Sequence, residues 1–113
     1  MYYVSKRMEI GVNPSYDSRY GKMYAHNWII TVYCRSDKLT DYGTIVNFTK
    51  IKNEIRNRLD HSCVNDVVYP INPTAESLAK WVCKRVSDIC EVGTCYKVEI
   101  QENEGNTATY VED

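Results

Sequence analysis

One carboxylate in this sequence stands where an apolar side chain is expected. Glu102 continues the alternation that places Val98 and Ile100 on the inner side of a predicted strand. A carboxylate on such a face costs free energy unless it has a partner. Glu102 therefore either binds a ligand at the inner face or sits at the strand end and reaches water.

A second candidate is the pair Asp60 and His61, at the end of a predicted helix. An imidazole titrates near neutral pH, and a neighbouring carboxylate can orient it and stabilise its charged form. The pair could move protons. The alternative is that His61 is favoured at a helix C-terminus by the helix dipole. The other histidine of the chain is His26.

The cysteines predict packing rather than crosslinking. There are five, an odd number, and no two have the CxxC spacing. We expect no disulfide scaffold, and small buried side chains instead. They are Cys34, Cys63, Cys83, Cys90 and Cys95.

Two strands are predicted at the start of the chain. Residues 2–10 alternate like a half-buried strand, residues 11–21 are rich in turn formers, and residues 23–35 are rich in β-branched and aromatic side chains. We expect a hairpin with a long irregular connection, followed by a polar turn at 36–43. The predicted inner side chains are Tyr2, Val4, Met8 and Ile10, then Trp28, Ile30, Val32 and Cys34.

Two helices are predicted next, joined by residues 62–73. Asn47 is the expected N-cap of the first, Asn72 and Pro73 give a start signal for the second, and Gly93 closes it. Each helix carries an apolar stripe. The stripes are Phe48, Ile51, Ile55 and Leu59, then Ala75, Leu78, Ala79, Val82, Val86 and Ile89.

The chain then returns to strand, with Tyr96, Val98 and Ile100 predicted inward. A turn at 103–106 leads to a last strand at 107–112. The element order ββααββ predicts an α+β domain, with a four-stranded antiparallel sheet and both helices on one face. Its open edges invite closure by oligomerisation.

Size and charge limit the possible functions. A chain of 113 residues is expected to form a single domain, residues 1–113. The net charge of −1 gives no field that would attract nucleic acid or acidic lipid. Residues 1–6 lack a signal-peptide core, and no apolar run approaches the ~18–20 residues of a membrane span. We therefore expect a cytoplasmic protein that binds neither nucleic acid nor a membrane.

Four short motifs carry a resemblance that covers nearly the whole chain. They are Ala25-His26-Asn27-Trp28, Gly43-Thr44-Ile45-Val46-Asn47-Phe48, Leu59-Asp60-His61 and Asn72-Pro73-Thr74-Ala75-Glu76. Their order and spacing resemble those of the 6-pyruvoyl-tetrahydropterin synthase family, which includes the bacterial 6-carboxytetrahydropterin synthases of queuosine biosynthesis. The alternative is an unrelated ββααββ domain with a chance set of motifs.

The resemblance implies the tunnelling fold, in which subunits close a β-barrel, commonly as trimers stacked into hexamers, with the active site between subunits. It implies that Glu102 anchors a pterin by accepting hydrogen bonds from the ring N–H and the exocyclic amine. It also implies backbone contacts to the pterin at Thr74 and Ala75, although Thr74 could be only a helix cap. Asp60 and His61 would form a proton relay beside a nucleophilic cysteine.

The chain departs from the family at its zinc ligands, which are three histidines. The resemblance places Asn13 or Pro14 at the first position, Tyr24 at the second and His26 at the third. Only His26 is retained, so we expect no zinc binding with the affinity of the family's three-histidine site, and the sequence indicates no other cofactor. Substitution by Asp17, Tyr24 or Cys63 is conceivable, but no spacing favours it.

The nucleophilic cysteine is also missing. Lys22-Met23 stands just before the motif that contains His26, where the resemblance places this cysteine, and Cys63 is the thiol nearest the expected site.

Three functions stay open. The first is a lyase that acts on a dihydropterin, such as 7,8-dihydroneopterin triphosphate, by altered chemistry. In a metal-independent route, Lys22, Tyr24 and Glu102 could resemble the set in dihydroneopterin aldolase, which uses a lysine and a tyrosine. The second is a non-catalytic binder of a pterin or purine-like ring. The third is a structural subunit that partners an active paralogue.

Overall fold

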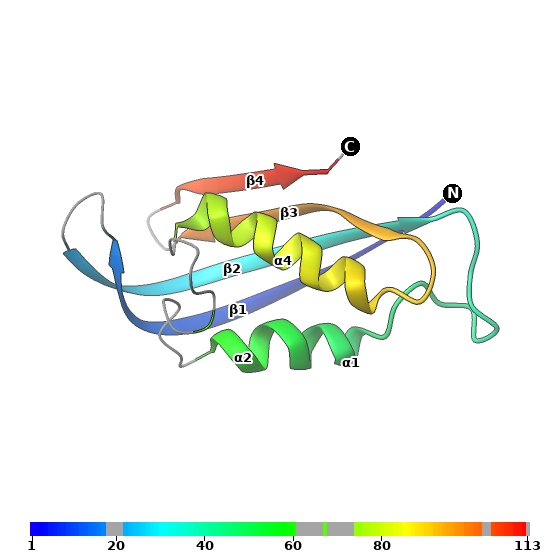
Figure 1. Cartoon of the computed structure of the whole chain (residues 1–113), viewed down its shortest axis with the longest axis horizontal. Helices are drawn as coiled ribbons and strands as arrows, with labels where there is room; N and C mark the ends of the chain where they lie inside the picture. Colours follow the sequence, from blue (N-terminus) through cyan, green and yellow to red (C-terminus); the bar gives the residue numbers. More distant parts are fainter. Residues whose placement is uncertain (18–21, 61–66, 68–73, 103–104, 113) are drawn as a thin grey trace.

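Four antiparallel strands form one sheet in the order β1-β2-β3-β4, and the helices cover one of its faces (Figure 1). This computed structural model describes residues 1–17, 22–60, 67, 74–102 and 105–112, without the side chains of 12–17 and 22–26. The strands are β1 (Tyr2–Asp17), β2 (Lys22–Ser36), β3 (Thr94–Glu102) and β4 (Thr107–Val111). The α+β architecture predicted from the sequence is confirmed.

The β1–β2 hairpin is longer than predicted. A loop was expected from residue 11 to residue 21, but the ladder continues to the pair Asp17 and Lys22. An irregular step falls between Val12 and Ser15, and Pro14 lies within it. Proline cannot donate to a ladder, but an edge strand or a bulge tolerates it. The turn-forming composition of this stretch is therefore compatible with strand.

The first helix combines α1 (Phe48–Ile51), the π-helical turn η1 (Lys52–Arg56) and α2 (Asn57–Leu59). Asn47 caps it as predicted, because its Oδ1 accepts a hydrogen bond from the Thr49 N–H at 2.8 Å. Most of the predicted stripe is buried. Phe48 is the exception, with 44% of its surface exposed. It lies beside edge strand β1, whose Lys6 ammonium is 5.8 Å from the ring centroid.

The second helix is α4 (Ala75–Ile89). Its N-cap is Thr74, whose Oγ1 accepts a hydrogen bond from the Ser77 N–H at 3.1 Å. The predicted start residues Asn72 and Pro73 lie outside the described part of the chain. The predicted stripe is buried from Ala75 to Val86, and Ile89 in the last turn is half-buried.

A bulge in β3 changes one predicted orientation. In the β2–β3 ladder Tyr33 pairs with Lys97 but Cys34 pairs with Cys95, which leaves Tyr96 as an extra residue. A bulge shifts the alternation of the strand. The prediction that Tyr96 points inward was therefore wrong, and Cys95, 1% exposed, takes the inner position.

Tyr96 instead lies on the outer face of the sheet. The Arg35 guanidinium carbon is 4.7 Å from its ring centroid. The ring of Tyr3 meets it edge-on, with 6.0 Å between centroids. Tyr2 also stays outside the core, with 49% of its surface exposed, because it lies at the start of the edge strand.

The hydrophobic core fills the space between the helices and the inner face of the sheet. Its completely buried members are Ile30, Ile51, Ile55, Leu59, Leu78, Ala79, Val82, Cys83, Val86, Val98 and Ile100. Within the described residues, no helix is both long enough and apolar enough to cross a bilayer. Figure 1 shows that the end of α2, the start of α4 and the end of β3 lie toward the same end of the molecule as the end of β1 and the start of β2.

Candidate functional site

A cleft lies at the junction of α4, β3 and β4, and Glu102 is one of its walls. Its volume is about 310 Å³. Ala75 and Glu76 line it from the first turn of α4, and Glu102 lines it from the last position of β3. The wall on the β4 side is Asn106, Thr107, Ala108 and Thr109. Two residues predicted to bind a pterin, Glu102 and Ala75, thus face the same cleft.

The backbone around Glu102 is well fixed. Glu102 pairs with Trp28 across the β2–β3 ladder, so it keeps the inner register expected from the sequence. Its N–H donates to the Asn106 carbonyl at 2.8 Å, and its carbonyl accepts from the Gly105 N–H at 2.9 Å. The half-buried side chain therefore projects from the rigid end of a strand.

Thr74 and Ala75 have different roles in the local structure. Thr74 uses its hydroxyl as the helix cap, which agrees with the simpler of its two interpretations. Ala75 is 4% exposed and contributes to the floor of the cleft. A small side chain at this first position lets a ligand approach the backbone of the helix start closely.

Asp60 occupies a neighbouring hollow rather than the cleft of Glu102. Its Oδ1 accepts a hydrogen bond from the Gly11 N–H at 2.9 Å. Its Oδ2 lies 3.6 Å from Nη2 of Arg56, and the Arg56 Nε donates to the Glu9 carbonyl at 3.2 Å. These contacts attach the end of α2 to edge strand β1. The hollow has a volume of about 550 Å³, and its lining is Glu9, Ile10, Gly11, Asn27, Trp28, Ile29, Arg56 and Asp60.

The remaining predicted residues are only partly described. His61 and Cys63 lie outside the described residues, and so does the side chain of His26. The backbone of His26 is in β2, opposite Val12. It directly precedes Asn27, which lines the hollow with Asp60. Asp60 and the backbone of His26 are therefore near one hollow, and the proton relay stays a prediction.

The comparison with protein families decides what kind of chain this is. The family model of 6-pyruvoyl tetrahydropterin synthase matches residues 10–113. This chain belongs to that family. The fold with two helices on a four-stranded antiparallel sheet is therefore the tunnelling fold, as the sequence motifs predicted.

Individual proteins and solved structures are similar to this chain over most of its length. A 6-carboxy-5,6,7,8-tetrahydropterin synthase from Synechocystis sp. is 26% identical over 105 residues, which are 86% of this chain and 81% of that protein. A crystal structure of an uncharacterized protein from Wolinella succinogenes has a TM-score of 0.71 at 13% identity, covering 99% of this chain and 98% of that one. The 6-pyruvoyl tetrahydropterin synthase of Plasmodium vivax has a TM-score of 0.62 at 12% identity, covering 97% and 98%. These structural likenesses show the fold.

The zinc ligands of the synthase family can be compared with the β1–β2 register. Val12 lies opposite His26 and Ser15 opposite Tyr24, with Asn13 and Pro14 in the irregular step between them. The three positions that the resemblance assigns to histidines thus share one stretch of ladder. They carry an amide or a proline, a phenol and one imidazole, whereas zinc sites are built from Cys, His, Asp and Glu. This donor set does not fit the family's three-histidine site.

Sequence reasoning gave no role to two residues that line these sites. Glu76 faces the cleft with Glu102, and it ends the Asn-Pro-Thr-x-Glu motif, which was the available signal. Arg56 holds Asp60, and the signal for it was its position four residues earlier on the same helix.

Proposed function

We propose that this protein binds a pterin, similar to 7,8-dihydroneopterin triphosphate, in the cleft beside Glu102, and that the family's zinc chemistry is lost or altered. The observation that carries the proposal is the Glu102 side chain at the wall of a cleft that also contains the start of α4. Ligand pockets commonly measure about 300–1,000 Å³, so the volume suits a small bicyclic ring. Membership of the synthase family supports the choice of a pterin.

The chemistry of the anchor is a carboxylate facing two parallel donors. A pterin presents a ring N–H and an exocyclic amine on one edge, and one carboxylate can accept from both. Each hydrogen bond to a charged group contributes roughly 1.5–3 kcal/mol. Because the backbone of Glu102 is held by hydrogen bonds to Gly105 and Asn106, the strand end that carries the carboxylate is ordered before binding.

The cleft is proposed to lie at a subunit interface. One wall is β4, which is an edge strand, and the other edge strand is β1. Apolar side chains are exposed on both edges near the same end of the sheet: Tyr3 is 62% and Val111 53% exposed. Joining such edges between copies would bury them and pair the free backbone groups. We therefore propose a homo-oligomer, whose size, a trimer or a hexamer, is the one that the family resemblance implies.

If the protein is an enzyme, we expect a lyase acting on a dihydropterin. Asp60 and His61 would act as an acid–base pair beside the hollow that the Asp60 carboxylate lines. General acid–base catalysis by itself contributes about 10²–10⁴-fold. No step is assigned to zinc, because the positions opposite one another in the β1–β2 ladder do not supply three imidazoles.

The same ladder positions favour a second candidate function. A chain that keeps the cleft of Glu102 but lacks the metal ligands would bind a pterin or purine-like ring without turning it over. It could also serve as a structural subunit beside an active paralogue. Turnover of dihydroneopterin triphosphate, assayed with and without added zinc, separates these: product formation favours the lyase, and its absence favours the non-catalytic alternatives.

Binding to Glu102 is tested by titrating the protein with 7,8-dihydroneopterin and following intrinsic fluorescence. Glu102→Gln keeps the shape of the side chain but loses its charge, so affinity should fall about tenfold or more. Glu99→Gln is the matched control, since Glu99 is on the same strand but on the outer face, against Tyr33. Its affinity should equal that of the parent. Equal affinity of the Glu102→Gln variant would contradict the anchor.

A further inference from the structure

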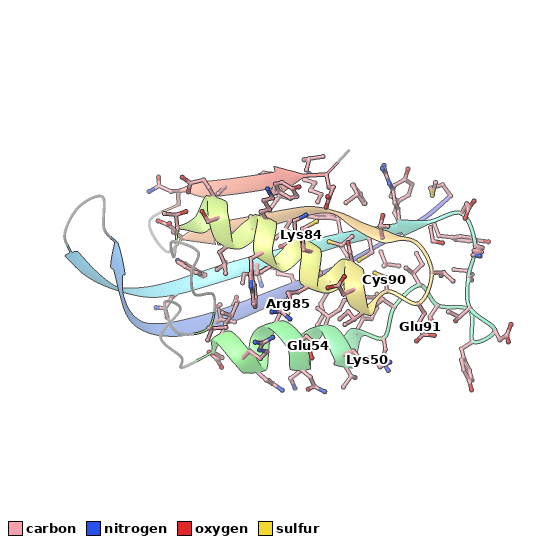
Figure 2. The ribbon with its side chains drawn as sticks, in the orientation of Figure 1. Lys50, Glu54, Lys84, Arg85, Cys90 and Glu91 are labelled. Atoms are coloured by element: carbon pink, nitrogen blue, oxygen red, sulfur yellow. The ribbon has the colours of Figure 1, made fainter. Side chains whose placement is uncertain are left out.

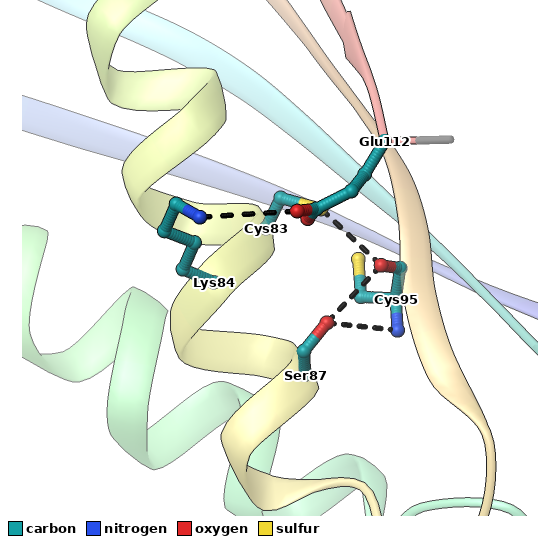
Figure 3. A network of polar contacts seen from close by, with 5 residues as sticks. All are labelled: Cys83, Lys84, Ser87, Cys95 and Glu112. Atoms are coloured by element: carbon teal, nitrogen blue, oxygen red, sulfur yellow. Dashed lines mark hydrogen bonds and ion pairs between the residues drawn. The ribbon is translucent and has the colours of Figure 1, made fainter.

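Cysteine side chains gather between the C-terminal half of α4 and the sheet. The described free cysteines are Cys34 in β2, Cys83 in α4, Cys90 at the C-cap of α4 and Cys95 in β3. Figure 3 shows part of this region, where the Ser87 hydroxyl contacts both the N–H and the carbonyl of Cys95, each at 3.1 Å. Among the described residues, no three His, Cys, Asp or Glu side chains are placed to hold a metal ion. The chemistry open to these side chains is that of their thiols.

Two of these sulfurs face each other directly. The Sγ atoms of Cys34 and Cys90 are 3.8 Å apart, although the residues are 56 positions apart in the chain. A disulfide requires about 2.05 Å between sulfurs. Cys90 ends the helix with extended backbone angles, φ −67° and ψ 127°, and an exposed residue, Glu91, follows it. Bond formation therefore requires the two sulfur atoms to come closer together than they lie in this structure.

The other two thiols are Cys83 and Cys95, and Cys95 also has a hydrogen-bond contact with Cys34. Cys83 donates to the Cys95 carbonyl at 3.3 Å, and its Sγ lies 3.8 Å from the Glu112 carboxylate. Cys95 donates to the Lys97 carbonyl at 3.6 Å. Cys83 is 0% exposed and Cys95 1%. Both are thus shielded from any oxidant dissolved in water.

Cys90 is accessible by comparison. It is half-buried, whereas Cys34 is 1% exposed, and Figure 2 shows Cys90 at the C-terminal end of α4, near Glu91. The hydrogen-bond contact with Cys34 lowers the pKa of Cys90, although burial acts in the opposite direction. The same contact, together with Cys95 and burial, raises the pKa of Cys34. The thiolate is the form that reacts with oxidants, so attack is expected to begin at Cys90.

We propose that Cys34 and Cys90 form a reversible disulfide that locks the end of α4 to β2. The oxidant is a hydroperoxide. The Cys90 thiolate attacks one peroxide oxygen, the O–O bond breaks, and the leaving oxygen takes a proton, which gives a sulfenic acid and an alcohol or water. The Cys34 sulfur then attacks the Cys90 sulfur, its proton and the sulfenic hydroxyl leave as water, and the S–S bond forms. Two thiols lose two electrons and two protons, and the peroxide gains both. Excess dithiol returns the pair to thiols by exchange.

The lock is remote from the pterin cleft. Cys34 and Trp28, the ladder partner of Glu102, are both in β2, and six residues of strand separate them by about 20 Å. A disulfide between Cys34 and Cys90, which are 56 positions apart in the chain, closes a long loop and so stabilises a small domain against unfolding. We therefore expect oxidation to raise Tm by roughly 5–15 °C and to leave pterin affinity unchanged. The inference thus stands or falls independently of the proposed function.

The test begins with the parent protein in reduced form, treated with hydrogen peroxide at low excess, then alkylated and digested. Trypsin alone leaves Cys90 and Cys95 in one peptide, 86–97, so a glutamyl endopeptidase is added to cleave after Glu91. The expected product joins peptide 23–35, which holds Cys34, to peptide 86–91, which holds Cys90, and disappears with dithiothreitol. A crosslink of peptide 23–35 to peptide 92–97, a crosslink to Cys63, or two intact thiols would overturn the proposal.

Variants connect the bond to stability. Cys90→Ser should abolish the rise in Tm on oxidation, while Cys63→Ser, which changes a thiol outside the pair, should retain it. The peptide map uses the unmodified chain, so it decides the question even where a variant folds poorly. A rise in Tm that persists in Cys90→Ser would contradict the lock.

Discussion

At the scale of single residues, two glutamates on β3 show how strand alternation assigns roles. Glu102 has the inner register and reaches the cleft, whereas Glu99 has the outer register and meets other side chains of the sheet. The Glu99 carboxylate accepts a hydrogen bond from the Tyr33 hydroxyl at 2.5 Å and lies 3.7 Å from the Lys97 ammonium. One carboxylate is thus occupied by contacts within the sheet, while the other lines the cleft between α4, β3 and β4.

The Tyr33 contact predicts a pH dependence. The hydrogen bond to Glu99, and to a lesser degree burial and the charge of Glu99, raise the pKa of Tyr33 above its ordinary value of 10.0. The folded state therefore holds this proton more tightly than the unfolded state does. The stabilisation is fully present below about pH 10 and is lost as pH rises through the higher pKa of the folded state.

The measurement is the difference in tyrosinate absorbance between the parent and Tyr33→Phe during an alkaline titration. In Glu99→Gln, the pKa of Tyr33 should return toward its ordinary value, because a neutral amide stabilises the protonated phenol less than a carboxylate does. A Tyr33 titration that is the same in the parent and in Glu99→Gln would contradict the assignment.

At the scale of the elements, the junctions matter as much as the helices and strands. Gly93 connects α4 to β3 with φ +70°, and a Cβ there would lie 2.1 Å from the Arg35 carbonyl oxygen. Gly43, between β2 and α1, has φ +77° but open space around the same position. The two glycines have similar backbone angles and differ in what surrounds them, so they form a matched pair.

Alanine at these glycines should therefore have unequal effects. Gly43→Ala should lower the free energy of unfolding by about 1 kcal/mol, the cost of a left-handed backbone with a Cβ. Gly93→Ala should lower it by about 3 kcal/mol or more, because the backbone of β2 must also move. Urea unfolding of both variants beside the parent measures the difference. Equal losses would mean that the junction next to Arg35 adapts without cost.

At the scale of the whole molecule, the sheet ends in two unpaired edges, β1 and β4. We predict a homo-oligomer, a trimer or a hexamer of the 13.1 kDa chain. Native mass spectrometry or light scattering after size exclusion gives its mass. Val111→Lys, at the exposed end of β4, should weaken assembly, because a charge on an edge strand disfavours pairing with another chain.

Tyr42→Lys is the control for this prediction. It adds the same charge at a highly exposed position in the connection between β2 and α1, outside β4. Its mass should match that of the parent. A monomeric parent would sink the interface proposal, and a Val111→Lys protein that assembles like the parent would exclude β4 from the contact.

The sequence by itself determined the element order, the antiparallel pairing and most of the core. It could do so because hydrophobic periodicity and capping residues act locally: Asn47 caps its helix, and Trp28, Ile30 and Val32 share a buried face as alternation requires. The cleft residues were found for the same reason: strand alternation led to Glu102 and the motif at residues 72–76 led to Ala75, and both are patterns within a short contiguous stretch.

Only the tertiary structure decided what depends on register and on contacts between distant segments. The bulge that turns Tyr96 outward is a property of two strands paired together, and the periodicity of β3 does not predict it. Likewise, odd cysteines without a CxxC spacing favoured packing alone, whereas folding brings Cys34 and Cys90 within 3.8 Å. Local patterns specify which way a side chain points along its own element, but the partner across the core is chosen when the elements pack.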